Sequence, residues 1–427
     1  MISIYKFFTN LFFPVFILFI FLRKILKKED PIRYKEKIFP SYFRTKKKSG
    51  NKLIWFHASS VGELKSILPI IKDVDKKNKN LEFLITTVTL SSGNLATAEI
   101  NNYNNIHHRF FPLDVTFLIN DFLDKWSPDS VFFIDSEIWP NFILQIKKRG
   151  IPLAILNARI TKKTYKRWKL FPKTAKKIFN KFDLCLTSNL ETKKYFEEFE
   201  AQNIYFNGNL KLINTTENKK DIYKNKDFLT KNRFWVAAST HPGEEELCLE
   251  THKILQKKFT NIITIIVPRH ISRANDIKKI CDNFGLNAKI HNLNDEMTNE
   301  NEIFIVNHYG SLNQYFNYAK SVFVGKSMLK SLKEVGGQNP IDPARLGCKI
   351  YHGKYVYNFK EIYEFLEKNS IAKSISNIDE LAQYLSFDLK NVKKDQNNFE
   401  SIVNNLGNKT LDEVMKSINK FLFNVSN

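Results

Sequence analysis

The sequence predicts an α/β protein of two successive doubly wound domains, each built on a parallel sheet, preceded by an N-terminal membrane-anchor helix. Three observations support this prediction. The chain has 427 residues, too many for one compact core and enough for two domains. Short apolar runs alternate with amphipathic stretches, a pattern typical of βαβ units. A polar, Lys- and Asn-rich segment at 214–226 interrupts this pattern, which then starts again.

The predicted organisation has four parts. Residues 1–28 form the anchor, 29–212 a Rossmann-like first domain and 213–398 a Rossmann-like second domain, and residues 399–427 form a helix that packs back across both. Buried strands in the first domain are expected at 52–56, 82–86, 130–134, 152–156, 183–186 and 204–206. Those in the second are expected at 234–238, 262–267, 303–306 and 321–324.

The anchor is predicted from an uncharged run at 11–22, LFFPVFILFIFL. With Phe7 and Phe8 this run reaches about 24 Å as a helix, short of a hydrocarbon core about 30 Å thick. Residues 23–48 hold eleven Lys or Arg and three acids, and no cleavage site follows the run. The positive-inside rule therefore places the body in the cytoplasm, tethered by one short or interfacial helix. The alternative is a buried amphipathic element of the first domain.

Composition limits the classes of partner and cofactor. Lys and Arg number 66 against 44 Asp and Glu, a formal charge of +22 that favours phosphorylated substrates, lipid headgroups or nucleic acid. A solvated basic surface is the simpler alternative. The four cysteines lie far apart, so no zinc or redox motif is indicated, and a reducing compartment fits. No Walker loop, dinucleotide fingerprint or carboxylate metal cage occurs, so neither a metal nor a cofactor is predicted.

Polar clusters follow the predicted strands, where ligands bind in open parallel sheets. In the first domain, Gly62 would let a substrate approach the backbone, and Glu63 is a candidate general base. Taken alone, Glu63 is more simply interpreted as a carboxylate that satisfies a helix N-terminus. Asp135 begins an acidic cluster before Pro140, and Lys211 follows the strand at 204–206.

In the second domain the corresponding clusters are small, cationic or glycine-rich. Ser239 and His241 follow one strand, Arg269 and His270 follow the next, and a glycine-rich turn at 336–343 leads into a helix. Together the clusters predict one cleft with carboxylates on one side and cations on the other. Such a cleft suits transfer of a group from a nucleotide donor to a hydroxyl.

The motifs occur in the order found in a known family. They comprise residues 57–63, 135–141, 157–159, 208–211, 238–245, 268–270, 336–343 and 358–359. On these motifs, spread over nearly the whole chain, the sequence resembles the 3-deoxy-D-manno-octulosonic acid (Kdo) transferases, glycosyltransferases of the GT-B fold. The resemblance implies transfer of Kdo from CMP-Kdo to the lipid A precursor, with inversion. It also implies a place at the cytoplasmic face of a bacterial inner membrane with anionic lipids.

The resemblance further implies the roles of individual residues. Glu63 matches the general base, and Asp135 and Lys211 match positions that assist the transition state. Substrate-binding positions are Gly62, Ser239, His241, Arg269, His270, Tyr309, Gly310, Ser311, Gln338, Asn339, Pro340, Ile341 and Asp342. The family usually has Glu at 135, Gly at 326, His at 338 and Glu at 342, where this chain has Asp, Lys, Gln and Asp.

Two other functions compete with this interpretation. The first is a GT-B transferase that uses a different nucleotide-sugar donor, which protection by UDP instead of CMP would reveal. The second is a membrane-tethered basic protein that binds nucleic acid. The sequence contains no recognised nucleic-acid module or aromatic-interleaved basic motif, and carboxylates follow the strands, so no nucleic-acid partner is expected.

Overall fold

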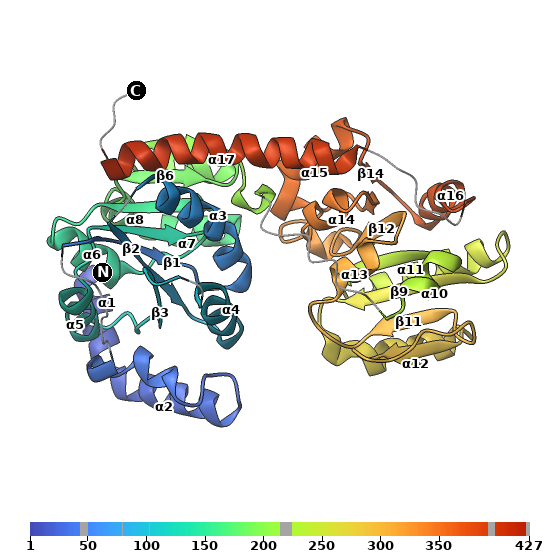
Figure 1. The fold of residues 1–427 in the computed structure, drawn as a ribbon, viewed down its shortest axis with the longest axis horizontal. Coiled ribbons are helices and arrows are strands. Elements are labelled where there is room, and N and C mark those ends of the chain that lie inside the picture. The colour runs from blue at the N-terminus through green and yellow to red at the C-terminus, as the bar shows by residue number, and fades with distance from the viewer. Residues whose placement is uncertain (43–49, 79, 102, 214–223, 392–397, 424–427) are drawn as a thin grey trace. The chain divides into compact units, whose positions relative to one another are not determined.

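The computed structural model describes residues 1–42, 50–78, 80–101, 103–213, 224–391 and 398–423 (Figure 1). Residues 43–49 of the basic segment and 214–223 of the predicted linker lie outside these ranges. The chain divides into two compact units, which we describe separately. Unit 1 comprises Met1–Thr215 with Gly407–Asn427, and unit 2 comprises Thr216–Leu406.

Unit 1 is built on a seven-stranded parallel sheet with the order β3-β2-β1-β4-β5-β6-β7. The strands are β1 (Lys52–His57), β2 (Leu81–Thr87), β3 (Ile106–Phe110), β4 (Ser130–Ile134), β5 (Leu153–Ala158), β6 (Leu184–Thr187) and β7 (Ile204–Phe206). The helices between them are α3 (Val61–Lys77), α4 (Leu90–Ile100), α5 (Thr116–Trp126), α6 (Pro140–Lys148), α7 (Lys162–Lys169), α8 (Pro172–Phe179) and α9 (Leu190–Glu198).

The central strands of unit 1 are apolar because both faces of the sheet are covered. Leu53 and Trp55 of β1 belong to one core cluster, whereas Ile54 and Phe56 belong to another. Successive strand side chains point to opposite faces, so one uninterrupted apolar run supplies both cores.

Unit 2 repeats this plan with the order β10-β11-β9-β8-β12-β13-β14, again parallel. The strands are β8 (Arg233–Thr240), β9 (Ile262–Pro268), β10 (Ala288–His291), β11 (Ile303–Val306), β12 (Ser321–Val324), β13 (Lys349–His352) and β14 (Ala372–Ser374). The helices are α10 (Lys226–Lys231), α11 (Glu244–Gln256), α12 (Ala274–Asn283), α13 (Leu312–Phe316), α14 (Ile341–Arg345), α15 (Lys360–Lys368) and α16 (Ile378–Asp388).

The strand orders place a topological switch point in each sheet. The chain first adds strands on one side of β1 and then crosses to β4 on the other side, and it does the same around β8 and β12. In doubly wound sheets the crevice at the carboxyl ends of these two strands is the ligand site. Each unit therefore has one edge where a site is expected.

The N-terminal segment forms two helices where the sequence predicted one, and its anchoring role stays a prediction. They are α1 (Ile2–Leu11) and α2 (Phe13–Ile25), bent by 58° at the break. Pro14 lies in the first turn of α2, and because it has no N–H and clashes with the preceding turn, it prevents one continuous helix. No single described helix meets the length and hydropathy expected of a membrane span, although the bent pair does when taken together.

The last helix, α17 (Phe399–Phe423), belongs to unit 1 from Gly407 onward. Its Val414, Met415 and Ile418 are buried in the same core cluster as Ile54 of β1. A Cβ at Gly407 would lie 2.2 Å from the Leu212 carbonyl oxygen, so this position requires glycine. The C-terminal segment thus completes the core of the first domain.

Candidate active site

The first candidate residues lie where β1 turns into α3. Ser60 caps α3, and Glu63 lies in its first turn. The Glu63 carboxylate accepts hydrogen bonds from the Ser59 N–H at 2.8 Å and from the Ser60 hydroxyl at 2.8 Å. Glu63 therefore stabilises the start of the helix, as the simpler interpretation predicted. Gly62 has open space where a Cβ would lie, which leaves its backbone accessible.

Glu63 is also perturbed in the way expected of an acid–base residue. It is only 9% exposed. Burial, and then the charge of Asp135, raise the pKa of Glu63 to about 7, although the hydrogen bond from Ser60 opposes the rise. Glu137 adds to the repulsion. A carboxyl group whose pKa lies near neutrality is suited to proton transfer.

A second carboxylate, Glu137, follows β4 and is held in place by hydrogen bonds. The His57 ring lies with Nε2 3.2 Å from Glu137 Oε2, and the Trp139 indole N–H donates to the same oxygen at 2.6 Å. His57 Nδ1 lies 3.0 Å from the Thr86 hydroxyl, and the ring stacks on Phe111 at 3.6 Å between centroids. Burial opposes ionisation, but the bonds from His57 and Trp139 prevail and lower the pKa of Glu137.

Glu63 and Glu137 thus have opposite protonation tendencies at the same sheet edge. Both follow strands at the switch point, β1 and β4, and their charges interact. Glu137 is ionised at neutral pH, whereas Glu63 gains and loses its proton near neutrality. Such a pair of carboxyl groups with separated pKa values is characteristic of acid–base sites.

Asp135 and Lys211 form an ion pair beside these groups. Lys211 Nζ lies 3.6 Å from Asp135 Oδ2, and the Asn157 amide donates to Asp135 Oδ1 at 3.3 Å. Asn157 also accepts from the Leu210 N–H at 3.0 Å, which fixes the turn that carries Lys211. Asp135 has φ of +60°, an uncommon conformation for a residue other than glycine that is found at functional sites. The structure therefore brings Glu63, Asp135 and Lys211 to one edge of unit 1.

Unit 2 has a small pocket at its own switch point. Its volume is about 170 Å³, and the predicted residues among those lining it are Ser239, Arg269, Gln338, Asn339 and Asp342. Ala238 and Val324, from β8 and β12, also line it, so the pocket lies at the carboxyl ends of the two central strands. Ligand pockets are commonly about 300–1,000 Å³, so this one suits only part of a nucleotide sugar.

The loops around this pocket are tied together by Glu244. Its buried carboxylate accepts from the N–H groups of His241 at 3.0 Å, Lys326 at 2.6 Å and Ser327 at 2.8 Å. The loop after β8 is thereby joined to the loop after β12. Lys326 has φ of +59°, in the left-handed region that favours glycine, which explains the glycine that the family usually has there.

The turn at 336–343, beside the pocket, requires glycine at 336 for steric reasons. A Cβ at Gly336 would lie 2.1 Å from the Tyr355 carbonyl oxygen. Asn339 Oδ1 accepts from the Ile341 N–H at 3.0 Å, which begins α14. The chain therefore approaches itself closely at 336–337 and then presents Gln338 and Asn339 to the pocket.

The other predicted binding residues lie around the pocket without lining it. The His241 and His270 rings are 6.3 Å apart, and Tyr309 is exposed. Ser311 is buried directly before Leu312, which lines the pocket, and its hydroxyl has no hydrogen-bond partner among the described residues. Gly310 has φ of +88°, while Pro340 and Ile341 are buried at the start of α14.

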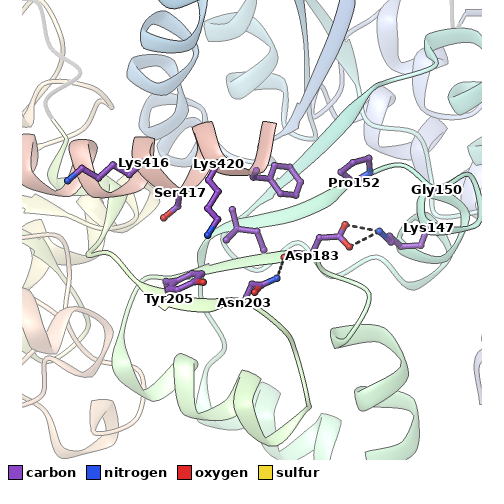
Figure 2. Close-up of a pocket in the computed structure, with 11 residues that line it drawn as sticks. Lys147, Gly150, Pro152, Asp183, Asn203, Tyr205, Lys416, Ser417 and Lys420 are labelled. Carbon is purple, nitrogen blue, oxygen red and sulfur yellow. Dashed lines mark hydrogen bonds and ion pairs between the residues drawn. The ribbon is translucent and has the colours of Figure 1, made fainter. Parts of the chain in front are cut away.

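A larger cavity in unit 1, of about 800 Å³, lies at the opposite edge of the sheet (Figure 2). Pro152, Leu184 and Asn203 line it at the amino ends of β5, β6 and β7, and α17 forms another side. Its one acid, Asp183, accepts from Lys147 at 2.7 and 2.8 Å, as the dashed lines show. Because this acid is neutralised and the edge is the wrong one for a doubly wound sheet, size alone does not make this cavity the reaction site.

Across the described ranges, no group of three or more His, Cys, Asp or Glu side chains could hold a metal ion.

The sequence predicted roles for Glu63, Asp135 and Lys211 but none for four other residues of the two sites: His57, Glu137, Asn157 and Glu244. All four lie inside the quoted motifs. Their roles depend on contacts between segments that are far apart in the chain. His57 and Glu137, for example, are in contact although 80 positions separate them in the sequence.

Comparison with known proteins bears on the family. Residues 33–214 match the family described as 3-deoxy-D-manno-octulosonic-acid transferase (kdotransferase). A 3-deoxy-D-manno-octulosonic acid transferase of Rickettsia felis is 30% identical over 377 residues, 87% of this chain and 79% of that protein. One of Rickettsia bellii is 28% identical over 431 residues, 99% of this chain and all of that protein.

Solved structures bear on the fold. A glycosyltransferase from Rickettsia africae has a TM-score of 0.59 at 13% identity, covering 88% of this chain and 100% of that one. The UDP-GlcNAc 2-epimerase of Neisseria meningitidis has a TM-score of 0.57 at 12% identity, with the same coverage. These likenesses show the fold alone, and they confirm the predicted GT-B architecture. From its Rickettsia relatives, the chain belongs to the 3-deoxy-D-manno-octulosonic acid transferase family and is a glycosyltransferase.

Proposed function

We propose that this enzyme transfers Kdo from CMP-Kdo to a glucosamine hydroxyl of the lipid A precursor, with inversion at the anomeric carbon. Glu63 carries the proposal. It is a buried carboxyl group with a pKa near 7 at the switch point of unit 1, beside the Asp135–Lys211 pair. A hydroxyl acceptor needs such a base, because it is a poor nucleophile until its proton is removed.

The proposed reaction is a single displacement. Glu63 accepts the proton of the acceptor hydroxyl, whose oxygen bonds to the anomeric carbon as the bond to the CMP phosphate breaks. CMP leaves with the electron pair as a phosphate monoester. Glu137 is kept ionised by His57 and Trp139, and with Asp135 it stabilises positive charge on the sugar.

Unit 2 is proposed to bind the donor. Arg269 and the polar residues around it line a pocket of the size of a phosphate-containing fragment, and Arg is the residue best matched to phosphate oxygens. The buried Ser311 hydroxyl nearby has no hydrogen-bond partner in the part of the chain that the structure describes, and it suits a polar ligand, since buried polar groups are normally satisfied.

The decisive experiment supplies purified protein with CMP-Kdo, generated in the reaction mixture, and lipid A precursor. Mass spectrometry of the lipid should show the mass of one or more Kdo residues. Protection of activity or of thermal stability by UDP and not by CMP would favour a different nucleotide-sugar donor. DNA affinity far above that for CMP would favour nucleic-acid binding. Absence of any Kdo adduct would contradict the proposal.

The pH dependence of kcat/KM should show the titration of Glu63. Because the pKa of Glu63 is raised to about 7, the base form is lost as pH falls through that value. We expect kcat/KM to rise with pH and to level off above about pH 7. Initial rates between about pH 5.5 and 8.5 test this, and a profile flat across that range would remove Glu63 as the base.

We further propose that α1 and α2 bind the cytoplasmic face of the inner membrane. Leu18, Phe19 and Leu22 of α2 are 58%, 57% and 48% exposed, an apolar surface followed by basic residues that favour anionic lipids. Replacing all three with Ser should release most of the protein from vesicles that contain anionic lipid, because each buried apolar side chain contributes about 1.5–3 kcal/mol.

A matched control replaces Leu293 and Phe387, which are 60% and 68% exposed in unit 2, with Ser. This variant should stay on the vesicles. Flotation on a density gradient measures the vesicle-bound fraction of each variant, and CMP binding checks that each protein is folded. Equal release of the two variants would mean that α2 has no special part in membrane binding.

A further inference from the structure

The start of α6 is capped by a side chain from outside the helix. Pro140 has no N–H, and Trp139 makes no side-chain cap. The free N–H groups of Asn141 and Phe142 donate instead to the Asp114 carboxylate, at 3.2 and 2.9 Å. Asp114 is 7% exposed and follows β3. It therefore supplies the cap that α6 lacks locally.

The N-terminal helix α1 completes this arrangement. The Tyr5 hydroxyl donates to Asp114 Oδ2 at 2.8 Å, and the Asn141 amide donates to the Thr9 hydroxyl at 3.0 Å and to the Asp114 carbonyl oxygen at 2.7 Å. In Figure 1, α1 lies beside α5 and α6. The N-terminal helix is thus bonded to the rest of unit 1 through the buried Asp114 and Asn141, in agreement with the alternative prediction that this segment belongs to the first domain.

The capped end of α6 carries the carboxylate loop, residues 135–139. Trp139 directly precedes Pro140, and its indole N–H donates to Glu137 at 2.6 Å. The Trp139 ring lies 5.7 Å from that of Phe111, which stacks on His57. A shift at the start of α6 would therefore move Trp139 and, through it, Glu137.

We propose that Asp114, together with Tyr5 and Thr9 of α1, positions the carboxylate loop for catalysis. The N-terminal segment would then serve the chemical step as well as the membrane. Asn141 is the last residue of the 135–141 motif. Its side-chain amide connects α1 to Asp114, because it donates to both the Thr9 hydroxyl and the Asp114 carbonyl oxygen. The inference rests on the proposed transfer reaction.

The protonation of Asp114 is consistent with this role. Burial raises the pKa of Asp114 to about 6, while the bonds from Tyr5, Phe142 and Asn141 oppose the rise. At about pH 7.5 the carboxylate is therefore the main form. As an acceptor only, it matches the three donors directed at it.

The test replaces Asp114 with Asn and assays transfer with CMP-Kdo and detergent-solubilised lipid A precursor, so that membrane binding does not enter. We expect kcat to fall by about 10- to 100-fold, since small misplacement of catalytic groups has effects of that order. KM for both substrates should stay nearly unchanged. Tyr5→Phe, which keeps the ring and removes one bond, should give a smaller fall in kcat and no further fall when added to Asp114→Asn.

Asp183→Asn is the matched control. Asp183 also accepts a backbone N–H, from Leu153 at 2.8 Å, but it directly precedes β6 and so lies at the opposite edge of the sheet. This variant should lose stability and keep its kcat. An Asp114→Asn protein with wild-type kcat, a loss confined to KM, or an equal loss in Asp183→Asn would each overturn the proposal.

Hydrogen exchange separates this inference from the proposed reaction. Amides at 136–143 should exchange faster in Asp114→Asn and in Tyr5→Phe than in the wild type, and those at 153–158 should not. If the wild type transfers no Kdo, the proposed function fails, and the exchange measurement still decides whether Asp114 holds the loop. Unchanged exchange at 136–143 in both variants would overturn the positioning role. Should Asp114→Asn prove poorly folded, exchange in the milder Tyr5→Phe variant alone decides the question, because it removes only the bond from Tyr5 to Asp114.

Discussion

Replacing Glu63 with Gln is expected to lower turnover by about 10²- to 10⁴-fold, the usual contribution of a positioned general base. Gln keeps the size of the side chain, and its one carbonyl oxygen can still accept from the Ser59 N–H while its NH2 group donates to the Ser60 hydroxyl oxygen, but it cannot take the proton of the acceptor. Binding of CMP should be unchanged, because the donor pocket is built by unit 2. Initial rates and CMP affinity on one preparation measure both quantities.

The stability of Glu63→Gln distinguishes catalysis from helix capping. The folded pKa of about 7 exceeds the ordinary value of 4.5, so ionising Glu63 lowers the free energy of unfolding as pH rises between these values. A neutral Gln avoids this cost, and the variant should be at least as stable as the wild type at about pH 8. A capping role alone would predict a loss of about 0.5–2 kcal/mol with activity kept.

Asn189→Ala provides the matched loss of a cap. Asn189 caps α9 by accepting from the Thr192 N–H at 2.7 Å, and α9 carries no candidate catalytic residue. This variant should be less stable and nearly fully active. A stable Glu63→Gln enzyme that turns over at the wild-type rate would end the assignment of Glu63 as the base.

Replacing Arg269 with Ala is expected to have the second-largest effect. A hydrogen bond to a charged group contributes about 1.5–3 kcal/mol, so the KM for CMP-Kdo and the Kd for CMP should rise by about 10- to 150-fold. The reason is the position of Arg269 after β9, where it lines the pocket at the switch point of unit 2. Calorimetry with CMP and kinetics at limiting donor measure the change.

Arg233→Ala is the control for this variant. Arg233 starts β8 at the amino end of the same sheet, and its guanidinium donates to the Leu389 carbonyl oxygen at 2.6 Å. Its loss should affect the stability of unit 2 without changing the affinity for CMP. Unchanged donor kinetics in Arg269→Ala would exclude Arg269 from the donor site and would count against the pocket in unit 2.

The sequence alone determined the fold class, because buried parallel strands have a simple signature. The runs at 130–134, 303–306 and 321–324 were predicted with the bounds that the structure shows. Four strands were missed: β3, β10, β13 and β14. Three of them are edge strands, which are partly open to solvent and therefore carry polar residues, as in IHHRF of β3. The break between α1 and α2 at Pro14 was overlooked within an otherwise apolar run.

The sequence also identified the family and three candidate catalytic residues, because its motifs follow one another along the chain in the order found in that family. Only the tertiary structure decided the burial, the pKa shifts and the hydrogen-bond partners of these residues. The pKa of Glu63 depends on burial and on the charge of Asp135, which pairing of β1 with β4 brings near. The lowered pKa of Glu137 depends on its contact with His57, and the position of the Asn141 side chain depends on its hydrogen bonds to Asp114 and Thr9. Electrostatic and hydrogen-bonding effects act over a few ångströms in space, and only folding brings residues so far apart in the chain within that distance.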